Sequence, residues 1–483
     1  MHWTAVQRVL GLLLMLFSIS MLPPLLVALI YQDAGGVPFA ASFLLILAAG
    51  CSLWLPVQRV RHELRIRDGF LIVVLFWTVL GLTGAVPLVL STAPSISLTD
   101  AAFESMSGLT TTGATILTGI EDLPHSIRFY RQQLQWMGGM GIIVLAVAIL
   151  PMLGIGGMQL FRAETPGPVK DSKLTPRIAE TAKALWYIYL TPTISCALAY
   201  WLAGMSLFDA IGHSFSTVAI GGYSTYDASI GHFDSALIEM IAVVFMLIAG
   251  INFALHFVAW RRRSISHYLQ DTEARWFFGI LLTVASVTFL TLAATNVYPT
   301  WGETLTKALF QAVAIGTTAG FTTDGFNLWP VFLPLLLVLT AFIGGCGMST
   351  GGGIKVIRFV LLIKQGYREI IRLVHPQAQV LVKIGNRAVD ERVIDAVWGF
   401  FAAYVALFVL MLLALMGTGL DQVTAFSAVA ATITNLGPGL GGVAENYGAI
   451  NVAAKWILMF AMLLGRLEVF TLLVLFTPAF WRR

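Results

Sequence analysis

Charged residues are scarce in this sequence, and cysteine is almost missing from it. Of its 483 residues only 11% are Asp, Glu, Lys or Arg, against roughly a quarter in ordinary soluble domains. Hydrophobic residues make up 58% and the mean hydropathy is +0.83, more apolar surface than a soluble core can bury. The three cysteines, Cys51, Cys196 and Cys346, show no ligand spacing, which argues against disulfides, metal binding and redox chemistry. The composition therefore predicts an integral membrane protein.

The chain also lacks a catalytic or nucleotide-binding motif. Its glycine-rich run at 344–353 contains Gly347-Met-Ser349-Thr-Gly351, which matches the nucleophile elbow of serine hydrolases, but an apolar helix rather than a strand is expected before it. The same run lacks the Gly-Lys-Ser/Thr ending of a phosphate-binding loop. We therefore expect no enzyme, no cofactor or nucleotide site in this chain, and no nucleic-acid partner.

Ten apolar runs are long enough to cross a membrane, which takes about 20 residues. The first two are 10–31, where Pro23 and Pro24 predict a bend, and 39–57. The other eight form four pairs: 71–90 with 134–153, 184–202 with 237–258, 277–294 with 332–345, and 396–416 with 453–476. The pattern predicts an all-α membrane protein with about ten spanning helices.

Lysine and arginine gather in the loops on one side of these spans. The clusters are Arg59 to Arg67, Lys170 to Lys183, Arg261 to Arg263, Lys355 to Arg372, and Arg482 with Arg483. Positive loops stay inside, so this side and both termini are expected to be cytoplasmic. The other side carries Asp100, Glu104, Glu121, Asp122, Asp209, Asp227, Glu303, Asp324, Asp421 and Glu445, against Arg128, Arg131 and Lys307. This predicts an acidic outer face that concentrates cations.

The four outer connections contain an internal repeat. In each one an alanine, Ala101, Ala210, Ala308 or Ala425, stands 12 positions before a glycine in a Gly/Thr-rich loop. The aligned glycines are Gly113, Gly222, Gly320 and Gly437. The repeat divides the chain into an N-terminal helix pair, 1–58, and four pore repeats, 59–160, 161–263, 264–375 and 376–483.

Each repeat is expected to hold a half-helix that enters the membrane and turns back. A helix of a dozen residues rises ~18 Å, too short for a hydrocarbon core of ~30 Å. Non-helical backbone at this depth must be packed in protein or line a wet cavity, so four loops predict one central path. Helix C-termini favour a cation, and glycine lets carbonyl oxygens face one axis. Close helix packing is the other common use of such glycines.

The repeated unit resembles the superfamily of K⁺ transporters that includes the bacterial Trk and Ktr and the plant HKT proteins, and most closely its TrkH/TrkG branch. The motifs are Thr-Thr-Thr-Gly113, Gly221-Gly222-Tyr, Thr-Thr-Ala-Gly320-Phe and Asn435-Leu-Gly437-Pro-Gly, with Leu-Gln-Trp-Met-Gly-Gly-Met-Gly at 134–141 and Gly465-Arg466-Leu-Glu468. They cover nearly the whole chain. The resemblance implies potassium uptake by a multi-pass protein of the bacterial cytoplasmic (inner) membrane.

The resemblance also implies one pore with a K⁺-binding selectivity filter built from all four repeats. The filter residues that it implies are Thr111, Thr112, Gly113, Ile220, Gly221, Gly222, Thr318, Ala319, Gly320, Asn435, Leu436 and Gly437. In that family a glycine at every filter position goes with K⁺, and a serine in the first loop goes with a Na⁺ preference. The four glycines therefore favour K⁺ as the transported ion.

A gate is expected below the filter, where a glycine-rich run breaks the second helix of the third repeat. The resemblance assigns it Gly344, Gly345, Gly347, Ser349, Thr350, Gly351, Gly352, Gly353 and Arg466. Met348 stands where a small residue is expected. Arg466 lies inside an apolar run, either as a paired structural arginine with Glu468 nearby or as a charge that raises the barrier to cations. His213 is expected to pack or hydrogen-bond rather than relay protons.

The resemblance further implies a homodimer in contact with membrane lipid and a TrkA-like cytosolic ring that binds the regulatory nucleotide. Passive flux and symport coupled to Na⁺ or H⁺ both fit the sequence. A solute symporter of another fold is the less favoured alternative, because its repeats are usually inverted, whereas these four run in the same direction.

Overall fold

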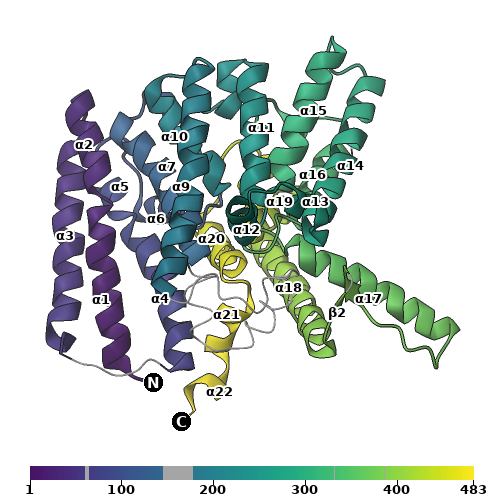
Figure 1. The fold of residues 1–483 in the computed structure, drawn as a ribbon. Helices are drawn as coiled ribbons and strands as arrows, with labels where there is room; N and C mark the ends of the chain where they lie inside the picture. Colours follow the sequence, from purple (N-terminus) through teal and green to yellow (C-terminus); the bar gives the residue numbers. More distant parts are fainter. Residues whose placement is uncertain (60–64, 145–177, 331, 386, 483) are drawn as a thin grey trace.

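The computed structural model describes residues 1–59, 65–144, 178–330, 332–385 and 387–482. Within this part the regular secondary structure is helical apart from one antiparallel hairpin of β1 (Lys383–Ile384) and β2 (Arg387–Ala388). The N- and C-termini lie at the same end of the molecule (Figure 1). The predicted helical fold is confirmed, whereas the end of the expected run 134–153 and the basic cluster from Lys170 to Arg177 lie outside the described residues.

The N-terminal helix pair forms one edge of the molecule (Figure 1). α1 (Trp3–Ile19) and α2 (Leu22–Tyr31) together make one apolar span of 29 residues, and α3 (Gly36–Trp54) packs along it. The helix is interrupted at Ser20 and Met21, just before the two prolines at which the sequence predicts a bend. Pro23 and Pro24 stand in the first turn of α2, where the missing N–H leaves no helical hydrogen bond unmade.

The remaining elements follow the four pairs expected from the sequence. In chain order they are η1 (Leu55–Val57), α4 (Ile66–Thr83), α5 (Val86–Leu90), α6 (Leu98–Leu109), η2 (Ile120–Asp122), α7 (His125–Val144), α9 (Ile178–Leu202), α10 (Leu207–Ala219), η5 (Ser229–Phe233), α11 (Ala236–Gly250), α12 (Phe253–Arg262), α13 (Ser266–Gln270), α14 (Thr272–Ala294), α15 (Trp301–Gly316), η6 (Phe326–Leu328), α16 (Leu333–Ala341), α17 (Val356–Val374), α18 (Glu391–Gly417), α19 (Gln422–Ile433), η7 (Gly441–Val443), α20 (Val452–Arg466), α21 (Phe470–Leu473), η8 (Val474–Phe476) and α22 (Pro478–Trp481).

Four short helices, α6, α10, α15 and α19, lie one in each pair. A polar side chain caps the start of each helix by accepting a hydrogen bond, at 3.0–3.2 Å, from the backbone N–H three residues later. The capping residues are Ser97, Ser206, Thr300 and Asp421. Such N-caps satisfy donors that a helix start leaves free. With 12, 13, 16 and 12 residues, these helices are shorter than a membrane crossing requires.

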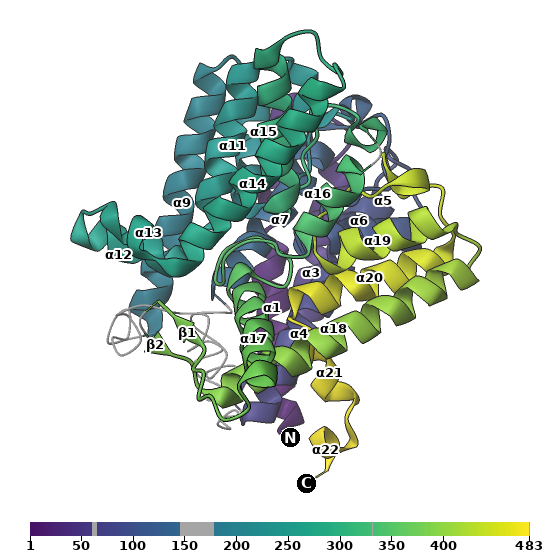
Figure 2. The same cartoon turned by 90° about the vertical axis from the view of Figure 1, so that its right-hand side faces the viewer.

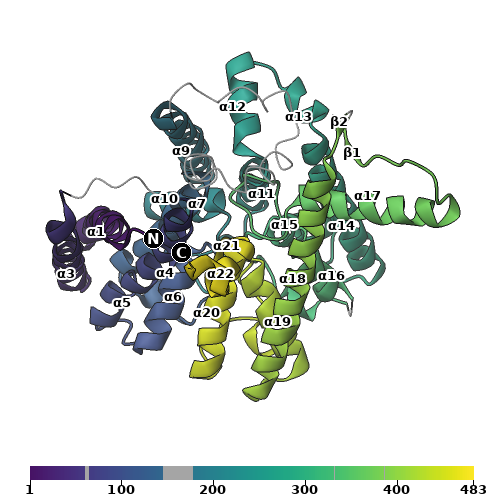
Figure 3. The ribbon, with the colours of Figure 1, turned by 90° about the horizontal axis from the view of Figure 1, so that it is seen from below.

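The pairs follow one another around the molecule in chain order, as seen from below in Figure 3 and from the side in Figure 2. Each short helix contacts the helix that closes the preceding pair: α10 packs against α7, α15 against α11, and α19 against α16. The first short helix, α6, packs against α20 of the last pair. The arrangement is therefore closed, with the end of the chain completing the ring.

Two of the expected apolar runs, 237–258 and 453–476, are broken by bends in the structure. α11 and α12 meet at 94°, and α20 meets the segment Phe470–Phe476 at 109°. Asn252 causes the first break, because its side chain caps α12 by accepting from the N–H of Ala254 at 2.8 Å. At the second break Glu468 and Val469 adopt φ of 52° and 55°, outside the helical region. Apolar composition alone therefore predicted too few breaks.

The acidic residues that the sequence placed together on one face differ in their exposure. Glu121, Asp227 and Asp324 are exposed, whereas Glu104 is 1% and Asp209 5% exposed. Asp209 accepts hydrogen bonds from Ser206 and Thr225 at 2.6 and 2.7 Å. The carboxylates of Glu104 and Asp209 therefore make contacts inside the protein and are not exposed to solvent.

Glu104 is the centre of a buried network that joins the first two pairs. Its carboxylate lies 2.7 Å from Nε of Arg131 and accepts from the N–H of Ile116 at 3.0 Å. Arg131 also donates to the carbonyl of Ser224 at 3.0 Å, and its guanidinium lies over the Tyr223 ring. The network ties α6, α7 and the loops that follow α6 and α10.

We expect Glu104→Ala to lower the free energy of unfolding by about 3–5 kcal/mol, because Arg131 is left buried without its counter-charge. The matched control is Arg372→Ala, which breaks ion pairs with the exposed carboxylates of Glu369 and Glu391 and should cost under ~1 kcal/mol. Thermal unfolding of the purified variants in detergent measures both. Equal melting temperatures for the two variants would contradict a stabilising role for the buried pair.

Candidate ion pathway

The four loops that follow the short helices share one unusual backbone conformation. Two positions before each aligned glycine, a residue with a side chain adopts a positive φ: Thr111 at 53°, Ile220 at 54°, Thr318 at 70° and Asn435 at 56°. The glycines Gly113, Gly222, Gly320 and Gly437 do so at 80°, 77°, 74° and 98°. A positive φ is strained for residues with a Cβ, so its recurrence at matched positions indicates a shared geometric requirement.

The same glycines bring the four loops into contact in a ring. A Cβ placed on Gly113 would collide with the carbonyl oxygen of Gly221, and one on Gly222 would collide with that of Ala319. A Cβ on Gly320 would meet the oxygen of Leu436, and one on Gly437 would lie 2.6 Å from that of Thr112. Each loop therefore faces the carbonyl that precedes the glycine of the next loop, and the fourth loop returns to the first.

Several buried carbonyl oxygens in this ring accept no hydrogen bond from the residues that the structure describes. Those of Thr111, Ile220, Thr318 and Asn435 accept no hydrogen bond from any residue in the described parts of the chain, and all four residues are at most 1% exposed. Buried carbonyls are normally hydrogen-bonded. Their oxygens, like those of Thr112, Ala319 and Leu436, accept no hydrogen bond within the described residues and can therefore bind water or a cation.

The ring is not fourfold symmetric in its hydrogen bonding. The carbonyl of Gly221 accepts from Nε2 of Gln135 at 2.6 Å, and that of Gly437 accepts from the Tyr447 hydroxyl at 2.7 Å. Oε1 of Gln135 accepts from the N–H of Tyr223 at 3.0 Å. Gln135 and Tyr447 therefore fix two loops, although the second lone pair of each carbonyl stays available.

The glycine-rich segment between α16 and α17 lies directly against the ends of three short helices. The N–H of Gly352 donates to the Thr318 hydroxyl at 2.7 Å, and that of Gly353 donates to the carbonyl of Thr434 at 3.0 Å. The hydroxyl of Thr350 donates to the carbonyl of Val218 at 3.0 Å. The segment thus contacts the second, third and fourth copies of the repeat at the C-terminal ends of their short helices.

Arg466 connects the glycine-rich segment to α7 of the first pair. Its guanidinium donates to the carbonyl of Thr350 at 3.4 Å and to that of Gly138 at 3.3 Å, and it lies 5.4 Å from the centre of the Trp77 ring. The residue is 5% exposed. Among the described residues no carboxylate lies within 4 Å of it; Glu468 instead pairs with Arg358 at 2.6 Å. Of the two alternatives left open by the sequence, a structural arginine paired with Glu468 is therefore not found.

Other contacts that hold the segment were not foreseen from the sequence. Oε1 of Glu273, a residue 2% exposed at the start of α14, accepts from the N–H of Gly347 at 2.6 Å. Met348 packs its side chain into the core around α9 and α11. The position of Glu273 at the edge of an apolar run could have marked it as a residue with a special contact. Its partner, Gly347, lies 74 residues away in the sequence, so no local pattern could have identified it.

His213 lies outside this set of contacts. It is fully buried, and its ring nitrogens lie 2.8 Å from the carbonyl of Asp209 and 2.9 Å from the Ser224 hydroxyl. Both nitrogens are therefore occupied by fixed partners, in keeping with the hydrogen-bonding role expected from the sequence.

Comparison with known proteins gives the chain its family. Residues 36–483 match the family described as "TrkH: Cation transport protein". The chain is 60% identical to the Trk system potassium uptake protein TrkH of Vibrio parahaemolyticus and 59% identical to that of Salmonella typhimurium, with all of each chain covered. The crystal structure of the potassium transporter TrkH from V. parahaemolyticus superposes with a TM-score of 0.93 at 57% identity, over all of both chains. These relatives are named as transporters rather than enzymes, and the chain belongs to the TrkH family of cation transport proteins.

Proposed function

We propose that the protein takes up potassium through a single pathway lined by the four loops. The observation that carries this proposal is the ring closure, in which each aligned glycine faces a carbonyl of the next loop and the fourth faces the first. The choice of potassium as the ion rests on the relatives named as Trk system potassium uptake proteins. One chain then provides one pore, with residues 59–160, 161–263, 264–375 and 376–483 as its four repeats.

Carbonyl oxygens select the ion in this proposal. The filter comprises the residues at the aligned glycines and the two positions before each, and the unpaired carbonyls of Thr111, Ile220, Thr318 and Asn435 replace part of the hydration shell of K⁺. The short helices end at these loops, and their negative dipole ends favour a cation there. No fixed carboxylate is required.

Arg466 and the glycine-rich segment form the gate. The segment lies against three short helices, and Arg466 donates to the carbonyl of Thr350 within it. A guanidinium stays protonated and repels cations strongly in a passage of low dielectric constant. The closed state therefore combines a backbone plug with a positive charge.

A cytosolic partner controls this gate. The relatives are named as parts of a Trk system, which supports a second component, and the sequence of this chain offers no nucleotide-binding fingerprint. We assign the nucleotide to a TrkA-like ring, and we place a homodimer of the chain in the bacterial inner membrane with both termini in the cytoplasm.

Flux through the purified chain in liposomes tests the function. We expect K⁺ and Rb⁺ to cross faster than Na⁺, and we expect ATP, ADP or NAD(H) to change the rate only after a cytosolic subunit is added. Imposed H⁺ and Na⁺ gradients distinguish passive flux from symport. A chain that moves no K⁺ with or without the subunit would refute the proposal, and a nucleotide response of the chain alone would refute partner control.

Gly113→Ser should weaken discrimination against Na⁺ by roughly 5- to 30-fold. The new Cβ meets the carbonyl of Gly221, and a positive φ at a residue with a side chain costs roughly 1–2 kcal/mol. The matched control is Gly204→Ser, also at a positive φ of 107° but with nothing within 4 Å of the new Cβ. Relative K⁺ and Na⁺ permeation is measured in liposomes. A loss of selectivity shared by both variants, or absent from both, would refute the filter assignment.

Arg466→Ala and deletion of residues 351–353 should each raise K⁺ flux measured without the partner. Both changes weaken the same closed state. The fold-increase in K⁺ flux of the double variant should therefore be smaller than the product of the fold-increases of the two single variants. Selectivity should change little, because the carbonyl ring remains. Arg372→Ala, which changes a side chain that is 38% exposed near the end of α17, is the control for loss of a positive charge. Well-folded variants with the flux of the parent would leave Arg466 and the segment with structural roles alone.

A further inference from the structure

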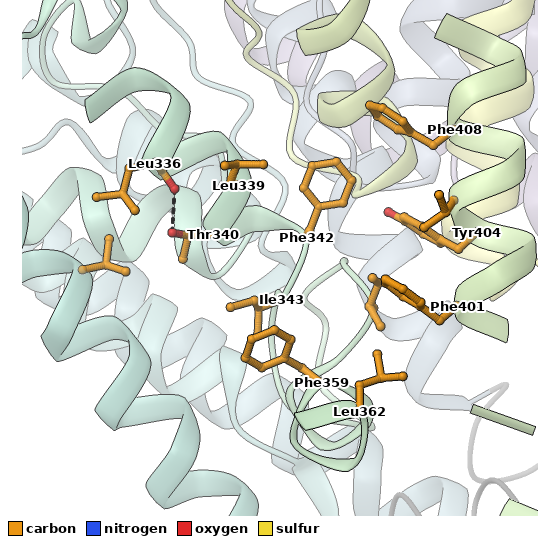
Figure 4. Close-up of a pocket in the computed structure, with 13 residues that line it drawn as sticks. Leu336, Leu339, Thr340, Phe342, Ile343, Phe359, Leu362, Phe401, Tyr404 and Phe408 are labelled. Carbon is orange, nitrogen blue, oxygen red and sulfur yellow. Dashed lines mark hydrogen bonds between the residues drawn. The ribbon is translucent and has the colours of Figure 1, made fainter. Parts of the chain in front are cut away.

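An apolar cavity of about 470 Å³ lies between α14, α16, α17 and α18. Phe342, Tyr404 and Phe408 form one wall, and Ile343 and Phe359 face them (Figure 4). Two further lining residues, Leu339 and Val405, are 48% and 42% exposed. The cavity therefore opens on the outer surface of the apolar helices, which lipid covers in a membrane.

A second cavity of about 800 Å³ adjoins the first and is basic. The two share Val284, Ile343 and Phe359 in their walls. Arg275 and Lys364 also line the second cavity, and none of the described residues that line it is Asp or Glu. Nζ of Lys364 donates to the carbonyl of Lys383 at 2.6 Å, and Nη2 of Arg275 lies 3.5 Å from the Thr272 hydroxyl. Ammonium and guanidinium groups have three and five donors, so both keep donors for an anion.

We propose that these joined cavities bind an anionic phospholipid, with its phosphate at Arg275 and Lys364 and an acyl chain in the apolar cavity. Basic pockets between membrane helices on the cytoplasmic side bind anionic headgroups. The apolar cavity explains why the ligand is a lipid rather than a soluble phosphate, because only a lipid fills both parts. The aromatic walls supply the contact area that holds the chain.

The acyl chain lies against the base of the glycine-rich segment. Phe342 and Ile343 immediately precede that segment, and their carbonyls accept from the N–H groups of Ile354 and Lys355 at 2.8 and 3.0 Å. These two bonds close the neck of the segment. A bound chain packs on Phe342 and Ile343 and holds the neck closed, so flux should depend on the lipid. This consequence rests on the proposed gate, whereas lipid binding does not.

Native mass spectrometry of the purified full chain tests the binding. Phosphatidylglycerol should bind more tightly than zwitterionic phosphatidylethanolamine. The double variant Arg275→Gln, Lys364→Gln should bind phosphatidylglycerol about 30-fold more weakly, because each basic residue near an anionic lipid contributes about 1 kcal/mol. The matched control is Arg261→Gln, Arg262→Gln, which removes two exposed charges outside both cavities.

A further variant, Val405→Trp, fills the apolar cavity from an exposed position on α18 and should weaken binding of both lipids. Equal binding of the two lipids by the parent, or equal phosphatidylglycerol binding by the two double variants, would overturn the proposal. A dimer that retains no lipid would also overturn it and would indicate that a second copy covers the cavities. Flux assays in liposomes with and without phosphatidylglycerol then test the gate separately, because a failed gate leaves the mass measurement unchanged.

Discussion

Buried backbone groups that leave a helix must find hydrogen-bond partners inside the protein, and in the four loops the N–H groups and the carbonyls meet this requirement differently. Their amides turn back to the short helices: Thr112 donates to Ser107, Gly221 to Ser216, and Leu436 to Ala431. With the donors satisfied locally, the carbonyls are the groups left over. Gln135, Glu104 and the glycine-rich segment hold these loops in the ring that the four aligned glycines close.

The sequence predicted the parts of this arrangement that repeat. Four glycines at one spacing from four alanines located the loops and the short helices before them, because a recurring backbone conformation needs the same residue in each copy. It did not predict the bends after Gly250 and Arg466, since apolar runs look alike whether straight or broken. Nor did it predict the partners of Glu104, Glu273 and Arg466, because contacts between distant segments occur once and leave no local pattern.

Two kinds of restraint coexist around the glycine-rich segment. Glu273 and the core around Met348 fix its first half, whereas its second half is held by hydrogen bonds to Thr318, Thr434 and Arg466. Two charged side chains contact that second half: the guanidinium of Arg466 donates to the carbonyl of Thr350, and the ammonium of Lys355 donates to the carbonyl of Gly351. If the segment moves, its first half therefore stays fixed, and its second half breaks hydrogen bonds to three of the four copies of the repeat.

Closure of the ring within one polypeptide also affects how such a protein changes over generations. In an assembly of four identical subunits, one altered codon changes all four quadrants at once. Here Pro438 or Tyr447 occurs in a single quadrant, so selection can adjust one quarter of the ring while three quarters keep the geometry. The price is a fixed circular order, because duplicated segments must keep their sequence along the gene for the fourth to meet the first.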